Sequence, residues 1–179
     1  MSALQSLKVL LADDNQHMRD IVSAILQSAG IRQIVEVSDG AMALDALRDH
    51  PVDLAIVDFN MFPLNGVEFT RLVRNSSESP NPYLPIIMMT GHSERALVTE
   101  ARDAGVTEFV VKPVNAKAIF GRLQALIMRP RPFVQTDHYF GPDRRRSNAA
   151  GYPGPWRRST DQREDVLTAV GSSSGPSAA

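Results

Sequence analysis

The sequence of 179 residues predicts an α/β protein built on a doubly wound, five-stranded parallel sheet with helices on both faces. Short hydrophobic runs alternate with stretches of helical periodicity, which is the pattern of repeated strand–helix units. The runs are apolar at successive positions, as strands buried on both faces require. Right-handed crossovers then place helices on both faces, and the carboxyl ends of the strands form one edge.

The first half of the chain supplies three strand–helix units. Leu7–Leu11 is apolar on both faces, and the helix expected from Asn15 carries apolar residues at three- and four-residue steps up to Ala29. Gly30 is suited to end that helix in a left-handed conformation. The remaining elements expected here are a strand at Ile31–Val37, a helix over residues 41–50, a strand at Asp53–Val57 and a helix at Gly66–Arg74.

The second half supplies two more strands and two more helices. After a polar loop rich in Ser and Pro at Asn75–Pro82, a strand is expected at Pro85–Met89. Asn115 is a suitable N-cap for the last helix. The other elements expected here are a helix at Ser93–Asp103, a strand at Thr107–Val111 and the last helix at Asn115–Met128.

Polar side chains follow four of the five runs. Asp13 and Asp14 follow the first run, Asp58 the third, Thr90 the fourth and Lys112 the fifth. Since strand ends of a parallel sheet share one edge, these groups should converge in one pocket. Carboxylate oxygens are ligands that Mg²⁺ prefers, and three carboxylates this close raise one another's pKa values unless a cation joins them.

Other interpretations of single residues remain open. The pair Asp13–Asp14 could be charge at a helix N-terminus, and Asp58 could begin an Asx turn. Thr90 could be an ordinary strand end, and Lys112 an ordinary surface lysine. No glycine-rich nucleotide loop is present, and His17, His50, His92 and His138 lack the spacing of a zinc site. Without cysteine there are no disulfides.

Taken together, the five positions resemble the receiver domain of bacterial two-component response regulators over roughly residues 7–128. The resemblance implies a flavodoxin-like fold with strand order 2-1-3-4-5, an order for which this family is itself a general example. It implies that Asp58 is the phosphoacceptor and that Asp13, Asp14, Asp58 and the backbone carbonyl of Asn60 hold Mg²⁺. Thr90 and Lys112 would contact phosphoryl oxygens.

The same resemblance makes Thr90 and Phe109 a conformational switch, although Phe109 could be a plain core aromatic. It implies a cis Lys112–Pro113 peptide. The family usually has Met-Pro three and four residues after the acceptor and Gly at eight. Here Met61 and Gly66 fit, but Phe62 takes the proline position and Pro63 follows. The loop could therefore differ in shape and in partner contacts.

The implied function is that of a stand-alone response regulator in two-component phosphorelay signalling. Such a regulator is a phosphoprotein and not an enzyme. Its partners would be a histidine kinase or a histidine phosphotransfer protein and an unknown downstream target. A phosphorelay intermediate or phosphate sink without a dedicated output is the alternative. An aspartate-based phosphatase would need a second acid two residues after the nucleophile, where this chain has Asn60.

We expect residues 1–128 to form the domain and residues 129–179 a Pro/Gly/Arg/Ser-rich tail that is largely disordered. We recognise no internal repeat. Residues 1–128 carry a net charge of −4 and the tail +3. No signal peptide or run of about 20 apolar residues is evident, so a cytoplasmic location and no membrane span are expected.

The tail nevertheless holds five of the eleven aromatic residues, interleaved with the basic clusters Arg144–Arg146 and Arg157–Arg158. Such side chains are favoured at interface hot spots, so they could dock on a partner or on the domain itself. A solvated tail is the other interpretation, and binding to nucleic acid is unlikely at a net charge of only +3. The five aromatic residues are Phe133, Tyr139, Phe140, Tyr152 and Trp156.

Overall fold

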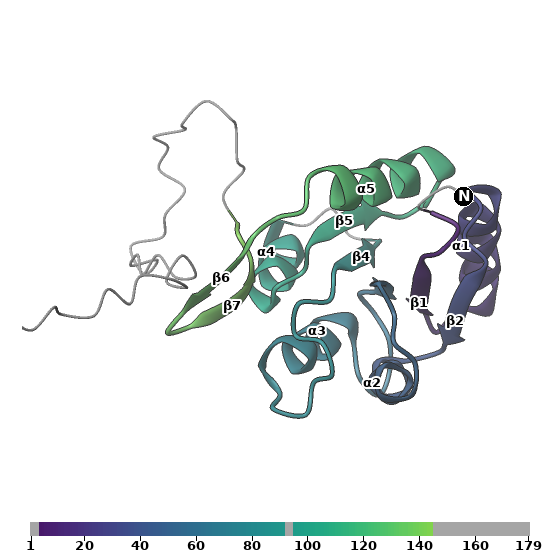
Figure 1. The fold of residues 1–179 in the computed structure, drawn as a ribbon. Helices are drawn as coiled ribbons and strands as arrows, with labels where there is room; N and C mark the ends of the chain where they lie inside the picture. The colour runs from purple at the N-terminus through teal and green to yellow at the C-terminus, as the bar shows by residue number, and fades with distance from the viewer. Residues whose placement is uncertain (1–3, 92–94, 145–179) are drawn as a thin grey trace, which may run out of the picture.

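A five-stranded parallel sheet with strand order β2-β1-β3-β4-β5 lies at the centre of the protein, as the sequence predicts (Figure 1). The computed structural model describes residues 4–91 and 95–144. The strands are β1 (Lys8–Ala12), β2 (Gln33–Val37), β3 (Leu54–Asp58), β4 (Ile86–Thr90) and β5 (Glu108–Val111). The helices between and after them are α1 (Gln16–Ser28), α2 (Gly40–Asp49), α3 (Gly66–Asn75), α4 (Arg95–Ala104) and α5 (Ala116–Met128).

The helices cover both faces of the sheet, so the central strands β1, β3 and β4 are buried on two sides (Figure 1). Leu10 of β1 belongs to the core shared with α2, α3 and α4, whereas its neighbour Leu11 belongs to the core shared with α1 and α5. This alternation follows from the two-residue period of a strand. It explains why β1, β3 and β4 consist almost wholly of apolar residues.

The helix ends agree with the signals in the sequence. The side chain of Asn15 accepts a hydrogen bond from the Met18 amide at 3.2 Å and caps α1, and Asn115 caps α5 in the same way. Gly30 adopts a φ of 92° just beyond α1, which confirms its predicted role at the helix end. The helix expected from Ser93 is described from Arg95, and its first expected residues lie outside the described ranges.

The C-terminal region contains a small antiparallel sheet that the sequence analysis does not predict. Strands β6 (Phe133–Thr136) and β7 (Tyr139–Pro142) form a hairpin with a two-residue turn, next to α3 and α4 (Figure 1). These strands are short and bordered by prolines, and their stabilising contacts come from distant segments. Residues 145–179, the rest of the predicted tail, lie outside the described part of the chain.

Within the described residues, no helix combines the length and the apolar character needed to cross a bilayer.

Candidate functional site

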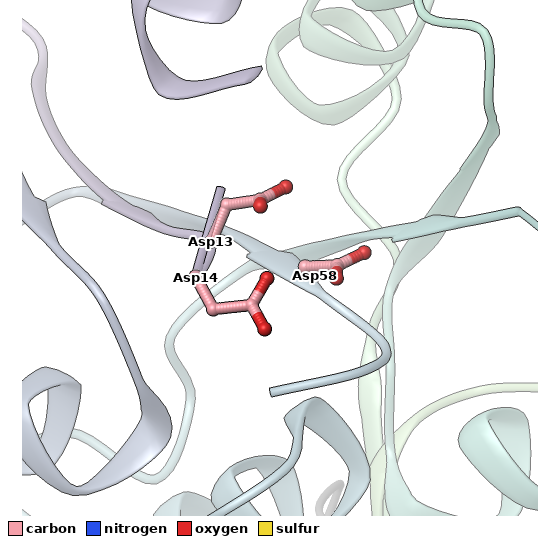
Figure 2. A group of neighbouring side chains, drawn as sticks. All are labelled: Asp13, Asp14 and Asp58. Atoms are coloured by element: carbon pink, nitrogen blue, oxygen red, sulfur yellow. The ribbon is translucent and has the colours of Figure 1, made fainter. Parts of the chain in front are cut away.

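Three carboxylates converge where β1 and β3 end at the same edge of the sheet (Figure 2). Asp13 and Asp14 follow β1, and Asp58 is the last residue of β3; the two strands pair directly. One carboxylate oxygen from each residue lies within 4.8 Å of the others. Asp13 is fully buried and Asp58 is 5 % exposed, whereas Asp14 faces solvent. The predicted convergence of these side chains is therefore present.

Lys112 brings a positive charge to the two buried carboxylates. Its Nζ lies 2.8 Å from Oδ1 of Asp58 and 3.0 Å from Oδ2 of Asp13. The backbone holds it there, because the Lys112 amide donates to the carbonyl of Thr90 at 2.8 Å. The Lys112–Pro113 peptide is cis, as the family resemblance implies. Lys112 thus belongs to the cluster and is not an ordinary surface lysine.

Burial and charge act in opposite directions on this pair. Burial raises the pKa of Asp58, and the hydrogen bond and charge of Lys112 offset only part of that increase. Burial lowers the pKa of Lys112, but the hydrogen bonds with Asp58 and Asp13 and the charges of the two carboxylates together outweigh burial, so the net shift is upward. Lys112 therefore remains a cation at neutral pH. It lies beside the Asp58 carboxylate, whose burial it offsets only in part.

The donor set fits a magnesium ion. Ligand oxygens around Mg²⁺ lie about 2.0–2.1 Å from the ion and hence roughly 3–4 Å from one another, so the three carboxylates need only small adjustments to share one. Asp14 faces solvent, which leaves room for the water ligands that Mg²⁺ retains. Asp13 is more constrained, because its Oδ1 accepts from the Asn15 amide at 2.8 Å and its carbonyl accepts from Arg19 at 2.6 Å.

The loop that follows Asp58 is held by two glycines whose role the sequence analysis does not identify. A Cβ on Gly66 would lie 2.3 Å from the carbonyl oxygen of Asp58, and one on Gly40 would lie 2.6 Å from the carbonyl oxygen of Leu64. The Gly40 amide donates to that same Leu64 carbonyl at 3.0 Å. The signal in the sequence is the spacing of Gly66, eight residues after Asp58.

The same loop contains the departure from the family pattern. Met61 is buried, whereas Phe62 is 86 % exposed, and the Phe62–Pro63 peptide is cis. Asn60, whose carbonyl is a predicted metal ligand, is exposed at the start of the loop. Its role as a ligand stays a prediction.

The predicted switch residues lie on neighbouring strands. Thr90 ends β4 and is buried, and Phe109 is half-buried in β5 against the core shared with α2, α3 and α4. Phe109 is not part of the carboxylate cluster. Beside Thr90, a Cβ on Gly91 would meet no described atom within 4 Å. Their switch roles stay predictions.

Proteins with the same architecture and similar sequence include chemotaxis regulators. The chain is 32 % identical to the chemotaxis protein CheY of Pseudomonas aeruginosa over 69 % of its own length and 98 % of that protein. It superposes on the chemotaxis response regulator CheY4 of Vibrio cholerae with a TM-score of 0.61 and 33 % identity, covering 67 % of this chain and 98 % of that one.

A second solved structure bears on the metal site. The receiver domain of the sensor histidine kinase PA1611 of Pseudomonas aeruginosa, which has a magnesium ion coordinated in its active-site cleft, is 25 % identical with a TM-score of 0.61, covering 68 % of this chain and 98 % of that one. Residues 9–124 match the family described as the response regulator receiver domain. The fold and the acidic site define a receiver module of two-component signalling. The chain belongs to the response regulator receiver domain family.

Proposed function

We propose that this chain is a stand-alone response regulator that accepts a phosphoryl group on Asp58 in a Mg²⁺-dependent reaction and signals through phosphorylation-dependent contact with another protein. The observation that carries the proposal is the arrangement of three carboxylates within 4.8 Å of one another with Nζ of Lys112 at 2.8 Å from Asp58. A nucleophile, a place for a divalent cation and a fixed positive charge are the parts that phosphoryl transfer needs.

In the proposed step, a carboxylate oxygen of Asp58 attacks phosphorus and forms an acyl phosphate, while the bond from phosphorus to the donor nitrogen or oxygen breaks. Lys112 stays protonated and places its charge against the phosphoryl oxygens, and the Thr90 hydroxyl donates a hydrogen bond to one of them. Asp13, Asp14, Asp58 and the carbonyl of Asn60 would hold Mg²⁺, which supplies charge neutralisation when bound.

Partners follow from this chemistry. The donor is a histidine kinase or a histidine phosphotransfer protein. A Cβ at Gly91 would meet no described atom within 4 Å, which supports access of this donor to Asp58. Asn60 stands where a second catalytic acid would be needed for rapid hydrolysis, which supports a phosphoprotein that is not an enzyme and loses its phosphate slowly. The downstream target stays unidentified, and the C-terminal region is a candidate for contacting it.

Intact-mass measurement tests the metal-dependent step. With a small acyl phosphate and Mg²⁺, the protein should gain one phosphate, and chelation of divalent ions should abolish the gain. Asp14→Asn should require a higher Mg²⁺ concentration, whereas Asp137→Asn in the β6–β7 turn, which is outside the site, should behave as the unmodified chain. Equal labelling in the presence of a chelator would contradict the proposal.

The alternative is a phosphate carrier without a dedicated output. It differs from a signalling switch in how far from Asp58 phosphorylation changes the structure. In a signalling switch, a phosphate mimic bound at Asp58 biases an existing equilibrium, so NMR shifts should extend through Thr90 to Phe109 on β5. Shifts confined to the residues around the carboxylates would favour the carrier.

A further inference from the structure

The β6–β7 hairpin is joined to the receiver by a short motif, Tyr139-Phe140-Gly141-Pro142-Asp143-Arg144-Arg145, whose described residues each have a defined contact. The hydroxyl of Tyr139 donates to the carbonyl of Pro142 at 2.7 Å. Gly141 lies against the receiver so closely that a Cβ there would be 3.0 Å from Cα of Gly105 and 2.6 Å from Oη of Tyr139. Only glycine fits that position.

Arg144, the first arginine of the motif, connects the motif to α4. The guanidinium carbon of Arg144 lies 3.6 Å from the centre of the Tyr139 ring, and its NH1 lies 3.3 Å from a carboxylate oxygen of Asp103 near the end of α4. The guanidinium therefore joins the ring of the motif to the receiver by a cation–π contact and an ion pair. Tyrosine, glycine and arginine thus each have a structural reason for their place.

The receiver surface beneath the motif is formed by the end of α3 and by the turns at Pro82 and Gly105. The buried side chain of Arg74, at the end of α3, donates to the carbonyls of Gly105 and Pro82 and lies under the ring of Phe133, with the guanidinium carbon 5.0 Å from the ring centre. The ring of Tyr83 packs against the rings of Phe133 and Phe140, with distances between ring centres of 5.1 and 5.2 Å. We call this surface the α3–α4 end surface; it consists of Arg74, Pro82, Tyr83, Asp103 and Gly105.

The same motif occurs a second time, in a short repeat that the sequence analysis does not recognise. Thirteen residues after Tyr139, the chain reads Tyr152-Pro153-Gly154-Pro155-Trp156-Arg157-Arg158. Five of the seven positions are identical in the two copies: the tyrosine, the glycine, the proline that follows the glycine, and both arginines. The contacts of the first copy explain the tyrosine, the glycine and the first arginine. Arg145 lies beyond the described residues, as does the whole second copy.

The differences between the copies are compatible with pairing to β6. The Asp143 amide donates to the carbonyl of Pro132 at 2.7 Å, and alternate residues of an antiparallel strand face the partner strand. The amides of Tyr139, Gly141 and Asp143 are therefore the ones directed at β6, and those of positions 140 and 142 are not. In the second copy both prolines, Pro153 and Pro155, take the positions that need no amide hydrogen.

We propose that the α3–α4 end surface together with β6 is a binding site for the Tyr-x-Gly-Pro-x-Arg-Arg motif, and that residues Tyr152–Arg158 of the same chain are a second ligand for it. The two copies exclude each other. The first is the preferred occupant, because its turn to β6 is only two residues long and because Pro153 lacks the aromatic ring with which Phe140 contacts Tyr83. The second occupies the site when the first is displaced, and attachment to the same chain favours it over a second molecule.

Paired glycine substitutions in the full-length chain test this exchange. Gly141→Val should displace the first copy and Gly154→Val should disable the second. Amide hydrogen exchange of Val134 in β6 reports occupancy of the site, and Ile56 in β3 reports the integrity of the receiver. Each single variant should keep most of the protection at Val134, whereas the double variant should lose it by about tenfold or more. Protection at Ile56 should be unchanged in all three.

Fluorescence supplies a second readout, because Trp156 is the single tryptophan of the chain and lies within the second copy. Collisional quenching of Trp156 should fall in Gly141→Val relative to the unmodified protein and return in the double variant. If Gly141→Val alone loses as much protection at Val134 as the double variant, or if the double variant keeps full protection, the proposal is wrong. Protection in Gly141→Val that depends on protein concentration would overturn the assignment to the same chain.

Discussion

Nζ of Lys112 lies 3.0 Å from a carboxylate oxygen of Asp13, although 99 residues separate the two in sequence. The parallel sheet causes this proximity, because β1 and β5 both deliver their carboxyl ends to one edge. The same nitrogen contacts Asp58, so a single cation connects both buried acids. In the proposed reaction this cation would lie beside the phosphoryl group.

Neutralising Lys112 should slow phosphorylation without unfolding the protein. Lys112→Met keeps the length of the side chain but removes the charge that would stabilise the phosphoryl oxygens, so the labelling rate with a small acyl phosphate should fall by about 10²–10³. Lys117→Met, an exposed lysine in α5, is the matched control and should label at the normal rate. An unchanged rate in Lys112→Met would remove Lys112 from the proposed mechanism.

The contact between Gly66 and Asp58 predicts opposite effects of the same substitution at two glycines. Gly66→Ala should lower the free energy of unfolding by about 1–3 kcal/mol, because its Cβ would meet the Asp58 carbonyl at 2.3 Å. Gly121 lies in α5, where an added Cβ would meet no described atom beyond its own helix backbone within 4 Å, so Gly121→Ala should raise the free energy of unfolding by roughly 0.5–1 kcal/mol through helix propensity. Urea unfolding measures both; equal effects would show that the loop after β3 adapts freely.

The hairpin predicts a pH limit for its own docking. Burial raises the pKa of Tyr139 above its ordinary 10.0, more than the charge and hydrogen bond of Arg144 lower it. A group whose folded pKa is raised stabilises the folded state below the unfolded pKa and loses that effect as the pH rises through the folded value. Docking should therefore weaken only above pH 10.0. The phenolate absorbance of the protein minus that of Tyr139→Phe gives the titration, and a midpoint at or below 10.0 would show that the ring is not buried.

Truncation separates the receiver from its C-terminal region. A chain ending at Met128 should still be phosphorylated, because every proposed site residue lies at or before Lys112. It should be less stable than a chain ending at Arg144 by roughly 1–3 kcal/mol, from loss of the two ring contacts with Tyr83. Equal unfolding midpoints for the two truncations would show that the hairpin adds nothing to stability.

The sheet and the carboxylate cluster could be predicted from the sequence because each depends on local pattern plus one topological rule. Asp58 needs only an apolar strand before it and a parallel neighbour to approach Asp13. The hairpin could not be predicted in this way. Phe133 and Phe140 are candidate anchors in the sequence, but their partner Tyr83 lies in a loop that no pattern connects to them. The sequence around Arg74 predicts only a polar helix residue, and its hydrogen bonds to the carbonyls of Gly105 and Pro82 depend on the fold.

The most direct test of the account is to locate the phosphate. An acyl phosphate on Asp58 is reduced by borohydride to homoserine, so mass spectrometry of peptides after labelling and reduction should find homoserine at position 58 and aspartate at positions 13 and 14. Asp58→Asn should yield no reduced residue. Homoserine at position 13 or 14, or a label that borohydride does not convert, would contradict the assignment of Asp58 as the phosphoacceptor.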